Sequence, residues 1–339
     1  DRLTGFEGDS PRSPPADLQD YPGFLEKLAK AGGTPTYRRP RCTGPITVKT
    51  LAPLHEDIAA MKSAMAAAGY AEGFLNSASP GVIALFQPSD FHASLDAYLF
   101  DLAEAMRHEY EAIVAAGLIL QIDAPDLGLG RHMMYKDLDE AGFLKRAAIH
   151  IEAINHGLRN IPRDRVRMHI CWGNYEGPHT RAVSLHAVLP ELLKSKPGAL
   201  LFEGANPRHA HEWTAWHDTK IPDDLVLIPG CLDSTTNFVE HPELVAQRLA
   251  NYVKAVGPDR VIDSPLAESG IIGTALGLAL RGYRPVVEIQ FDGFVFPGYD
   301  QIVTQVARMR FRSGGRLRVP MVIRIPFGGH IGSIEHHGE

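Results

Sequence analysis

The sequence predicts an α/β protein built around a mainly parallel sheet, because short apolar runs alternate with long stretches of helical periodicity. Strands this apolar, separated by helices, are typical of βαβ units whose sheet is covered on both faces. The small and polar residues that follow the runs mark where each strand ends. The predicted strands are residues 73–76, 118–123, 166–172, 199–203, 225–230 and 260–263.

Two of the predicted helices also carry a stop signal. The stretch 57–69, DIAAMKSAMAAAG, repeats apolar residues at helical spacing and ends on Gly69. The longer stretch 94–117 ends in the same way on Gly117. Glycine is the usual residue just past a helix, since it adopts the left-handed conformation that closes the last turn.

Chemistry-bearing residues gather directly after the predicted strands. Asp123, Asn174, Glu203 and Asp233 each lie at or just beyond the end of an apolar run. Closed barrels and open doubly wound sheets both place their sites at the carboxyl ends of the strands, and the pattern leaves these two architectures open. We therefore expect one pocket to which several strands contribute.

Composition and charge restrict the class of partner. The chain of 339 residues is 45% hydrophobic and carries a net charge of −6, so neither nucleic acid nor an anionic membrane is expected as its partner. Its three cysteines are too few and too widely spaced for a disulfide framework, which favours a cytoplasmic location. No apolar run approaches the roughly 18 residues that a membrane span requires. The expected partners are small molecules.

His169 and Cys171 form a candidate metal-binding pair in the run VRMHICW. Alternate residues of a strand point to the same face, so these two side chains can approach one ion. Glu203 ends the next predicted strand and could add an oxygen ligand, which gives the N, S and O set that zinc accepts. The alternative is a core histidine beside a buried cysteine, an ordinary place for a free thiol.

Residues 1–260 resemble the cobalamin-independent methionine synthase family. The motifs that carry the resemblance are PRCTGPITV, LQIDAPDL, MHICWGNYEGPHTR, LLFEGANPRHAHEW and LIPGCLDSTTNFVEHPELVAQRL, in this order. The resemblance implies an incomplete TIM (β/α)8-type barrel that lacks its N-terminal strands. It implies a zinc ion held by His169, Cys171 and Glu203, and contact between Asp123 and the amino-acid substrate. The implied reaction is zinc-dependent transfer of a methyl group from a methylated folate-type donor to a homocysteine-like thiol.

The sequence departs from that family at two functional positions, and we expect activity to be impaired. The family's fourth zinc ligand is a cysteine in a D-C-G turn on the last strand, where this sequence reads DSPLAESG. The family's general acid is a histidine after the strand that matches LIPGCLDS, where this sequence has Asp233, Ser234 and Thr235. Cys231 is the remaining thiol near the strand ends, but it follows a different strand from the family's cysteine.

Residues from about 259 to 339 resemble a second family, the β subunit of branched-chain 2-oxoacid dehydrogenase. The resemblance lies in DRVIDSPLAESGIIGTALGLALRGYRPVVEIQFDGFVFPGYDQIV and RVPMVIRIPFGGHIGSIEHHGE and implies part of a transketolase-like pyrimidine-binding domain. It implies that Glu268 and His337 contact thiamine diphosphate. The other half of such a cofactor site belongs to a partner α subunit, so we do not expect this chain alone to hold thiamine diphosphate.

The sequence thus predicts two joined parts, a barrel over 1–260 and a pyrimidine-binding fragment over 261–339. Three interpretations of function remain open. The first is a methyltransferase with zinc, and the second is a fragment of a thiamine-diphosphate-dependent dehydrogenase that needs a partner subunit. The third is a non-catalytic chimera.

Overall fold

The apolar runs predicted as strands form the central sheet of the protein. The computed structural model describes residues 2–10, 15–30, 39–68, 72–173, 178–233, 240, 242–257, 268–282, 284–289 and 295–325. The strands are β1 (Phe6–Glu7), β2 (Arg41–Cys42), β3 (Phe74–Ala78), β4 (Ile119–Asp123), β5 (Val166–Ile170), β6 (Ala199–Glu203), β7 (Val226–Gly230), β8 (Val286–Glu288) and β9 (Val322–Arg324).

Helices occupy most of the intervals between these strands. They are α1 (Ala16–Asp20), α2 (Pro22–Lys30), α3 (Ala52–Ala68), α4 (Pro80–Phe86), α5 (Leu95–Ala115), α6 (Gly130–Met133), α7 (Glu140–Gly157), α8 (Leu185–Leu192), α9 (Trp213–His217), α10 (Pro242–Val256), α11 (Glu268–Leu280), α12 (Val295–Asp300) and α13 (Ala307–Arg312). The predicted stop at Gly117 is confirmed, because its φ is +87° and α5 ends two residues earlier. The predicted stop at Gly69 and the predicted strand 260–263 lie outside the described residues.

Strands β3 to β7 pair in parallel in the order of the sequence, β3-β4-β5-β6-β7. A doubly wound sheet reverses its strand order at a switch point, whereas consecutive βα units of a barrel do not. The observed order therefore matches the barrel pattern. Among the described strands the sheet remains open between β3 and β7, and a closed barrel is not shown. The fold that is shown is a mixed α/β fold with a parallel sheet.

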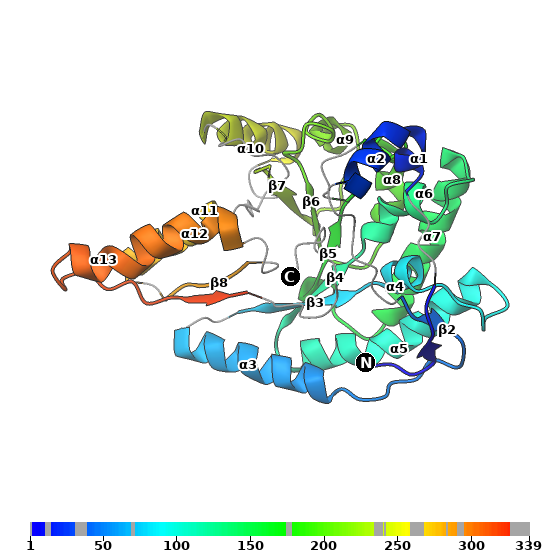
Figure 1. The fold of residues 1–339 in the computed structure, drawn as a ribbon, viewed down its shortest axis with the longest axis horizontal. Coiled ribbons are helices and arrows are strands. Elements are labelled where there is room, and N and C mark those ends of the chain that lie inside the picture. Colours follow the sequence, from blue (N-terminus) through cyan, green and yellow to red (C-terminus); the bar gives the residue numbers. More distant parts are fainter. Residues whose placement is uncertain are drawn as a thin grey trace.

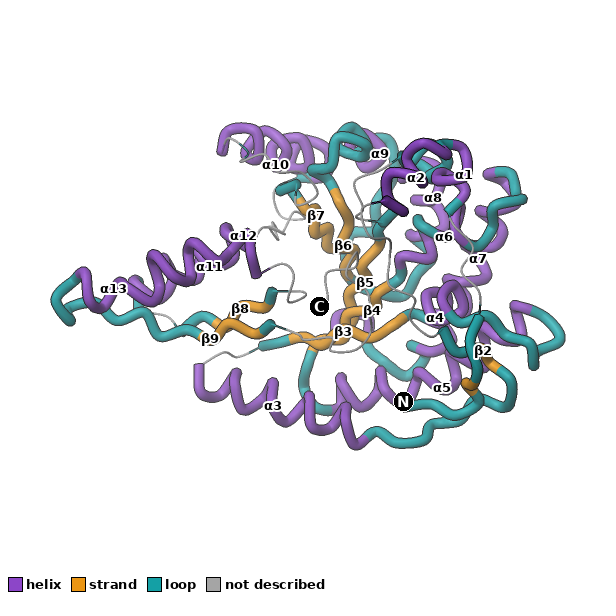
Figure 2. The backbone as a smooth tube through the Cα atoms, in the orientation of Figure 1, coloured by secondary structure: helices purple, strands orange, loops and turns teal. Residues whose placement is uncertain are grey.

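Helices cover one side of this sheet and build the main core with it. In Figure 1, α3, α5, α7, α8, α9 and α10 follow the outside of the arc of strands, and Figure 2 shows the same layer in purple. Tyr110 of α5, Phe143 of α7 and Leu189 of α8 are fully buried in one cluster with residues of the sheet. Burial of this apolar layer supplies most of the free energy that holds the βα units together.

The register of the strands divides their side chains between two faces. Leu120, Met168, Phe202 and Leu227 are buried in the main core against the helices. Residues that alternate with them point to the opposite, concave face. Arg167 on that face donates to the Gln121 side chain at 2.6 Å and lies 3.6 Å from the centre of the Phe74 ring.

The C-terminal segment forms a separate small sheet. Strands β8 and β9 pair in parallel, and α11, α12 and α13 accompany them. Ile272 and Ile289 are buried in this segment, together with two alanines of α11 and Pro285. Tyr299 and Phe311 are exposed, the latter by 87%. None of the described helices is long and apolar enough to span a membrane.

Candidate functional site at the ends of strands β4 to β6

The carboxyl ends of three adjacent strands bring the predicted site residues to one face. Asp123 pairs in register with His169, so their side chains share the concave face of the sheet. His169 also pairs with Leu201, and Glu203 lies two residues beyond Leu201 on the same face. Cys171, two residues beyond His169, extends that face into the loop after β5. The strand register therefore puts His169, Cys171 and Glu203 on the same face of the sheet, as the sequence predicts.

Asp123 and His169 form the closest pair of the site, with Oδ1 and Nδ1 2.5 Å apart. Burial by itself would lower the pKa of His169, but the hydrogen bond to Asp123 and its negative charge outweigh burial and raise the pKa above 6.5. The carboxylate orients the imidazole, because Nδ1–H donates to it and Nε2 is then the free lone pair. Nε2 is the atom that His169 can offer to a ligand.

Cys171 is partly buried, and burial together with the charge of Asp123 raises the pKa of its thiol. A nearby cation would reverse that effect, since a positive charge favours the thiolate. The loop after β4 packs closely on this residue: a Cβ on Gly128 would lie 2.5 Å from the Cys171 carbonyl oxygen. Glycine at 128 thus allows the loop after β4 to pack against the backbone of Cys171.

Glu203 is held in a pocket of aromatic and imidazole rings that the sequence did not reveal. Its Oε1 is buried, lacks a hydrogen-bond partner among the described residues, and lies 3.8 Å from His209 Nε2. Burial raises the pKa of Glu203. His209 stacks on Trp172 with ring centres 4.7 Å apart, and its Nδ1 lies 2.8 Å from Glu212 Oε2. An unsatisfied buried carboxylate oxygen favours a positively charged ligand at this point.

A buried hydrogen-bond chain fixes the loop that follows Asp123, and it was also missed in the sequence. Ser79 Oγ donates to Asp126 Oδ1 at 2.6 Å, and His150 Nδ1 lies 2.7 Å from Asp126 Oδ2. The chain continues from His150 Nε2 to the Tyr135 hydroxyl at 2.6 Å. Its members come from four separate segments of the chain, so no local spacing identifies it. The chain holds η1 (Pro125–Leu127) beneath the candidate site.

The donor set suits zinc in chemistry, but its side chains are not gathered around a point. No group of three or more His, Cys, Asp or Glu side chains in the described part of the chain is placed to hold a metal ion. His169, Cys171 and Glu203 still supply N, S and O donors on one face, and the unsatisfied Glu203 oxygen fits a cation. Cys231 directly follows β7, two strands along the sheet from β5 and Cys171, and its side chain is fully buried. The stretch DSPLAE, where the fourth ligand is replaced, lies mostly outside the described residues.

The two residues predicted to contact thiamine diphosphate are not brought together by the described structure. Glu268 is the first residue of α11. His337 lies outside the described residues. Their predicted contact with a cofactor stays a prediction.

Sequence comparison finds relatives of the C-terminal part of the chain. The family model of the transketolase pyrimidine-binding domain matches residues 218–339. The pyruvate dehydrogenase E1 component subunit beta of Leifsonia xyli subsp. xyli is 69% identical over 83 residues, which are 24% of this chain and 25% of that protein. The protein of the same name from Acholeplasma laidlawii is 56% identical over 90 residues, 26% of this chain and 28% of that protein. The chain thus spans about a quarter of the length of these curated relatives.

Structural comparison gives a different neighbour. A B12-independent methionine synthase from Shewanella sp. W3-18-1, solved in complex with selenomethionine, superposes with a TM-score of 0.53 at 17% identity. The superposition covers 78% of this chain and 69% of that chain, and at this identity it shows a shared fold. Both predicted resemblances are confirmed. The chain combines a methionine-synthase-like fold with a C-terminal sequence like that of pyruvate dehydrogenase E1 β subunits.

Proposed function

We propose that the described sheet is part of an incomplete TIM barrel, and that its site transfers a methyl group to a homocysteine-like thiol from a methylated folate-type donor. The observation that carries the proposal is the common face shared by Asp123, His169, Cys171 and Glu203 at the ends of three adjacent parallel strands. The likeness to a methionine synthase fold supports it. His169, Cys171 and Glu203 are the proposed zinc ligands.

Each residue of the site has a part in this proposal that follows from its contacts. Zinc, when bound, would act as a Lewis acid that keeps the acceptor thiol deprotonated near neutral pH. Asp123 holds the His169 ring so that Nε2 faces the site, and its side chain, 45% exposed, can also pair with the ammonium group of an amino-acid acceptor. Trp172 and His209 close the side of the site next to Glu203 and shield its carboxylate from water.

The test is methyl transfer from 5-methyltetrahydropteroyltriglutamate to homocysteine by the purified chain with zinc added. We expect slow turnover in the wild type and none above background in Cys171→Ser or His169→Ala. Cys42→Ser removes a buried thiol remote from the site and serves as the matched control. Equal turnover in wild type and Cys171→Ser, or none in the wild type, would contradict the proposal.

A second candidate function rests on the 69% identity of the C-terminal part to a pyruvate dehydrogenase β subunit. In this alternative, residues from about 261 onward bind the aminopyrimidine of thiamine diphosphate through Glu268, with His337 in the active site, and a partner α subunit supplies the rest. Calorimetric titration of thiamine diphosphate and Mg²⁺ with and without an added α subunit tests it. Binding only in the presence of the α subunit, and lost in Glu268→Gln, is the expected result.

The third candidate is a chimera that folds in part and catalyses neither reaction. The exposed Tyr299 and Phe311 in a segment with few buried apolar side chains favour it for the C-terminal part. If a folded chain shows neither methyl transfer nor binding of thiamine diphosphate, this third interpretation is the one that remains. The division into 1–260 and 261–339 belongs to the same proposal. Truncation after residue 260 tests it, because the family model matches from residue 218 onward.

A further inference from the structure

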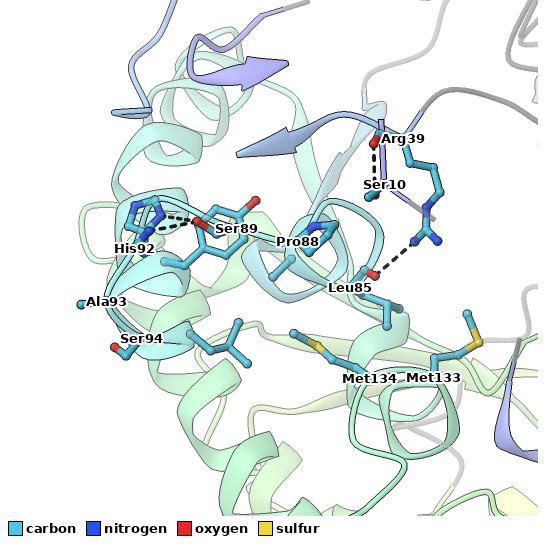
Figure 3. Close-up of a pocket in the computed structure, with 13 residues that line it drawn as sticks. Ser10, Arg39, Leu85, Pro88, Ser89, His92, Ala93, Ser94, Met133 and Met134 are labelled. Atoms are coloured by element: carbon cyan, nitrogen blue, oxygen red, sulfur yellow. Dashed lines mark hydrogen bonds between the residues drawn. The ribbon is translucent and has the colours of Figure 1, made fainter. Parts of the chain in front are cut away.

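A cavity of about 500 Å³ lies between α4, the start of α5 and α6, away from the site at the strand ends. Its lining is mainly apolar, with Leu85, Tyr98, Met133 and Met134 among the contributing side chains. Polar side chains reach it from two sides. Figure 3 shows Ser89 and His92 on one side of the cavity and Arg39 on another. A mostly apolar cavity of this size with a few polar groups suits a small organic molecule.

Ser89, His92 and Asp101 form a continuous hydrogen-bonded chain at the edge of this cavity. Ser89 Oγ lies 2.7 Å from His92 Nδ1, and His92 Nε2 lies 2.9 Å from Asp101 Oδ2. The His92 side chain is only 4% exposed, whereas that of Asp101 is 60% exposed. We propose that this chain is a second, hydrolytic site, at which Ser89 is acylated by an ester of a small apolar carboxylic acid.

The two hydrogen bonds of the imidazole fix which nitrogen carries the proton. The Asp101 carboxylate accepts only, so the proton of neutral His92 is on Nε2. Nδ1 is then the lone pair that accepts the hydroxyl proton of Ser89. Nucleophilic serines are activated by this arrangement of base and orienting carboxylate, which is recognised by geometry and not by sequence order. Asp101 acts here as a positioning residue.

The backbone and the neighbouring rings hold this chain in place. The backbone N–H groups of Phe91 and His92 each donate to Ser89 Oγ at 3.2 Å, which holds the hydroxyl beside His92 Nδ1. The His92 ring lies 4.9 Å from the Tyr98 ring, centre to centre, and the Tyr98 hydroxyl donates to the Gln87 carbonyl. The ring of His92 is therefore packed in the orientation that its two hydrogen bonds need.

Cys42 is the competing nucleophile near the same imidazole. Its Sγ lies 3.9 Å from His92 Nδ1, but the side chain is fully buried, donates to the Gly44 carbonyl at 3.3 Å, and does not line the cavity. Ser89 does line the cavity and is much closer to Nδ1. The geometry selects the hydroxyl over the thiol.

The reaction follows from these contacts. Ser89 Oγ bonds to the ester carbonyl carbon while its proton moves to His92 Nδ1, and the alcohol leaves with that proton when the C–O bond breaks. Water then attacks the acyl-serine and gives a proton to Nδ1, the acid departs, and Ser89 recovers its proton. The apolar lining by Leu85, Met133 and Met134 selects esters whose acyl group is uncharged.

The experiment is labelling of the full chain with a fluorophosphonate probe, with mass-spectrometric mapping, beside hydrolysis of p-nitrophenyl butyrate. We expect one label per chain, on Ser89, lost in Ser89→Ala and reduced about tenfold or more in His92→Gln. Ser63→Ala, an exposed serine of α3, and Cys42→Ala should label as the wild type does. No label on the wild type, a label on another residue, or a label that persists in Ser89→Ala would overturn the proposal.

Two further variants separate a catalytic role from a structural one, since Ser89 also binds two backbone N–H groups. Ser89→Cys keeps a side chain that can accept these bonds, and the site should then react with iodoacetamide at residue 89. Asp101→Asn, whose amide can donate to Nε2 and move the proton to Nδ1, should slow labelling and alter its pH profile, and Asp101→Glu should partly restore both. A Ser89→Cys chain that is folded but inert to iodoacetamide, or an Asp101→Asn chain unchanged in rate and pH profile, would contradict the assignment.

Discussion

Asp123 Oδ1 and His169 Nδ1 lie 2.5 Å apart across two register-paired strands, β4 and β5. The contact joins the residue proposed to orient an amino-acid acceptor to a proposed zinc ligand. Any change at Asp123 therefore alters both the charge available to a substrate and the proton affinity of the imidazole.

Replacing Asp123 by Asn should shift the pH dependence of zinc binding. The pKa of His169 is raised by Asp123, so in the wild type the proton competes with zinc as pH falls through a value above 6.5. Without the carboxylate the imidazole binds its proton less tightly, and loss of zinc on acidification should begin at lower pH. At a pH well above the pKa of the imidazole in both proteins, loss of the orienting hydrogen bond should weaken affinity by about 10- to 100-fold.

Zinc affinity measured by competition with a chromogenic chelator between pH 5.5 and 8.5 checks this prediction. Asp218→Asn is a suitable control, because Asp218 is exposed and pairs with the neighbouring exposed His217. Identical pH profiles for the wild type and Asp123→Asn would show that the contact does not set the protonation of the metal ligand.

Zinc content should depend on Cys171 more than on the other thiols. Because Cys171 is the sulfur donor on the concave face, Cys171→Ser should lower zinc affinity by at least about tenfold, as even changes beyond the direct ligands do. Inductively coupled plasma mass spectrometry of dialysed protein measures the zinc per chain. Cys42→Ser should keep the wild-type content. Full zinc content in Cys171→Ser would contradict the ligand assignment, and loss only in Cys231→Ser would point to a different thiol.

The sheet and the predicted ligands could be predicted from the sequence because each depends on local pattern. The runs 118–123 and 166–172 were identified from their apolar residues, and they are the parallel neighbours β4 and β5. Asp123 and Glu203 were identified because polar residues at strand ends share one edge of a parallel sheet. His169 and Cys171 needed only the alternation of a strand.

What the sequence could not predict depends on contacts between distant segments. His150 joins Asp126 across 24 residues, and Ser79 joins it across 47, so no motif spacing brings these three together. His209 was likewise missed, since only its stacking on Trp172 places it beside Glu203. Pattern alone also leaves the choice between a barrel and a doubly wound sheet open. The strand order from β3 to β7 matches the barrel pattern but does not show a closed barrel.

Gly81→Ala should destabilise the fold through the buried chain beneath the site. A Cβ at this position would lie 1.9 Å from Asp126 Oδ2 and 2.4 Å from His150 Nδ1, so the network must shift or break. The expected loss in the free energy of unfolding is about 1–3 kcal/mol, as for other overpacked buried sites. Urea denaturation monitored by circular dichroism measures it.

Gly23→Ala in α2, where a Cβ meets nothing within 4 Å, is the control and should be neutral or slightly stabilising. Equal midpoints for the two variants would show that the network tolerates the added methyl.

Limited proteolysis should cut the C-terminal segment before the parallel sheet. Local opening costs little free energy where few apolar side chains are buried. The described apolar cluster of this segment has Ile272 and Ile289 as its buried members, with five partly buried side chains packed around them. Its described surface exposes Phe311 to chymotrypsin and Arg308 and Arg312 to trypsin. Both proteases should therefore cleave first between about residues 308 and 318 and leave a fragment that contains β3 to β7. The digests use a low ratio of protease to protein, and mass spectrometry identifies the fragments. The use of two proteases separates local opening from a mere abundance of arginines. A first cut between β3 and β7 by either protease, with residues 268–325 intact, would contradict the prediction and would identify the sheet as the weaker part.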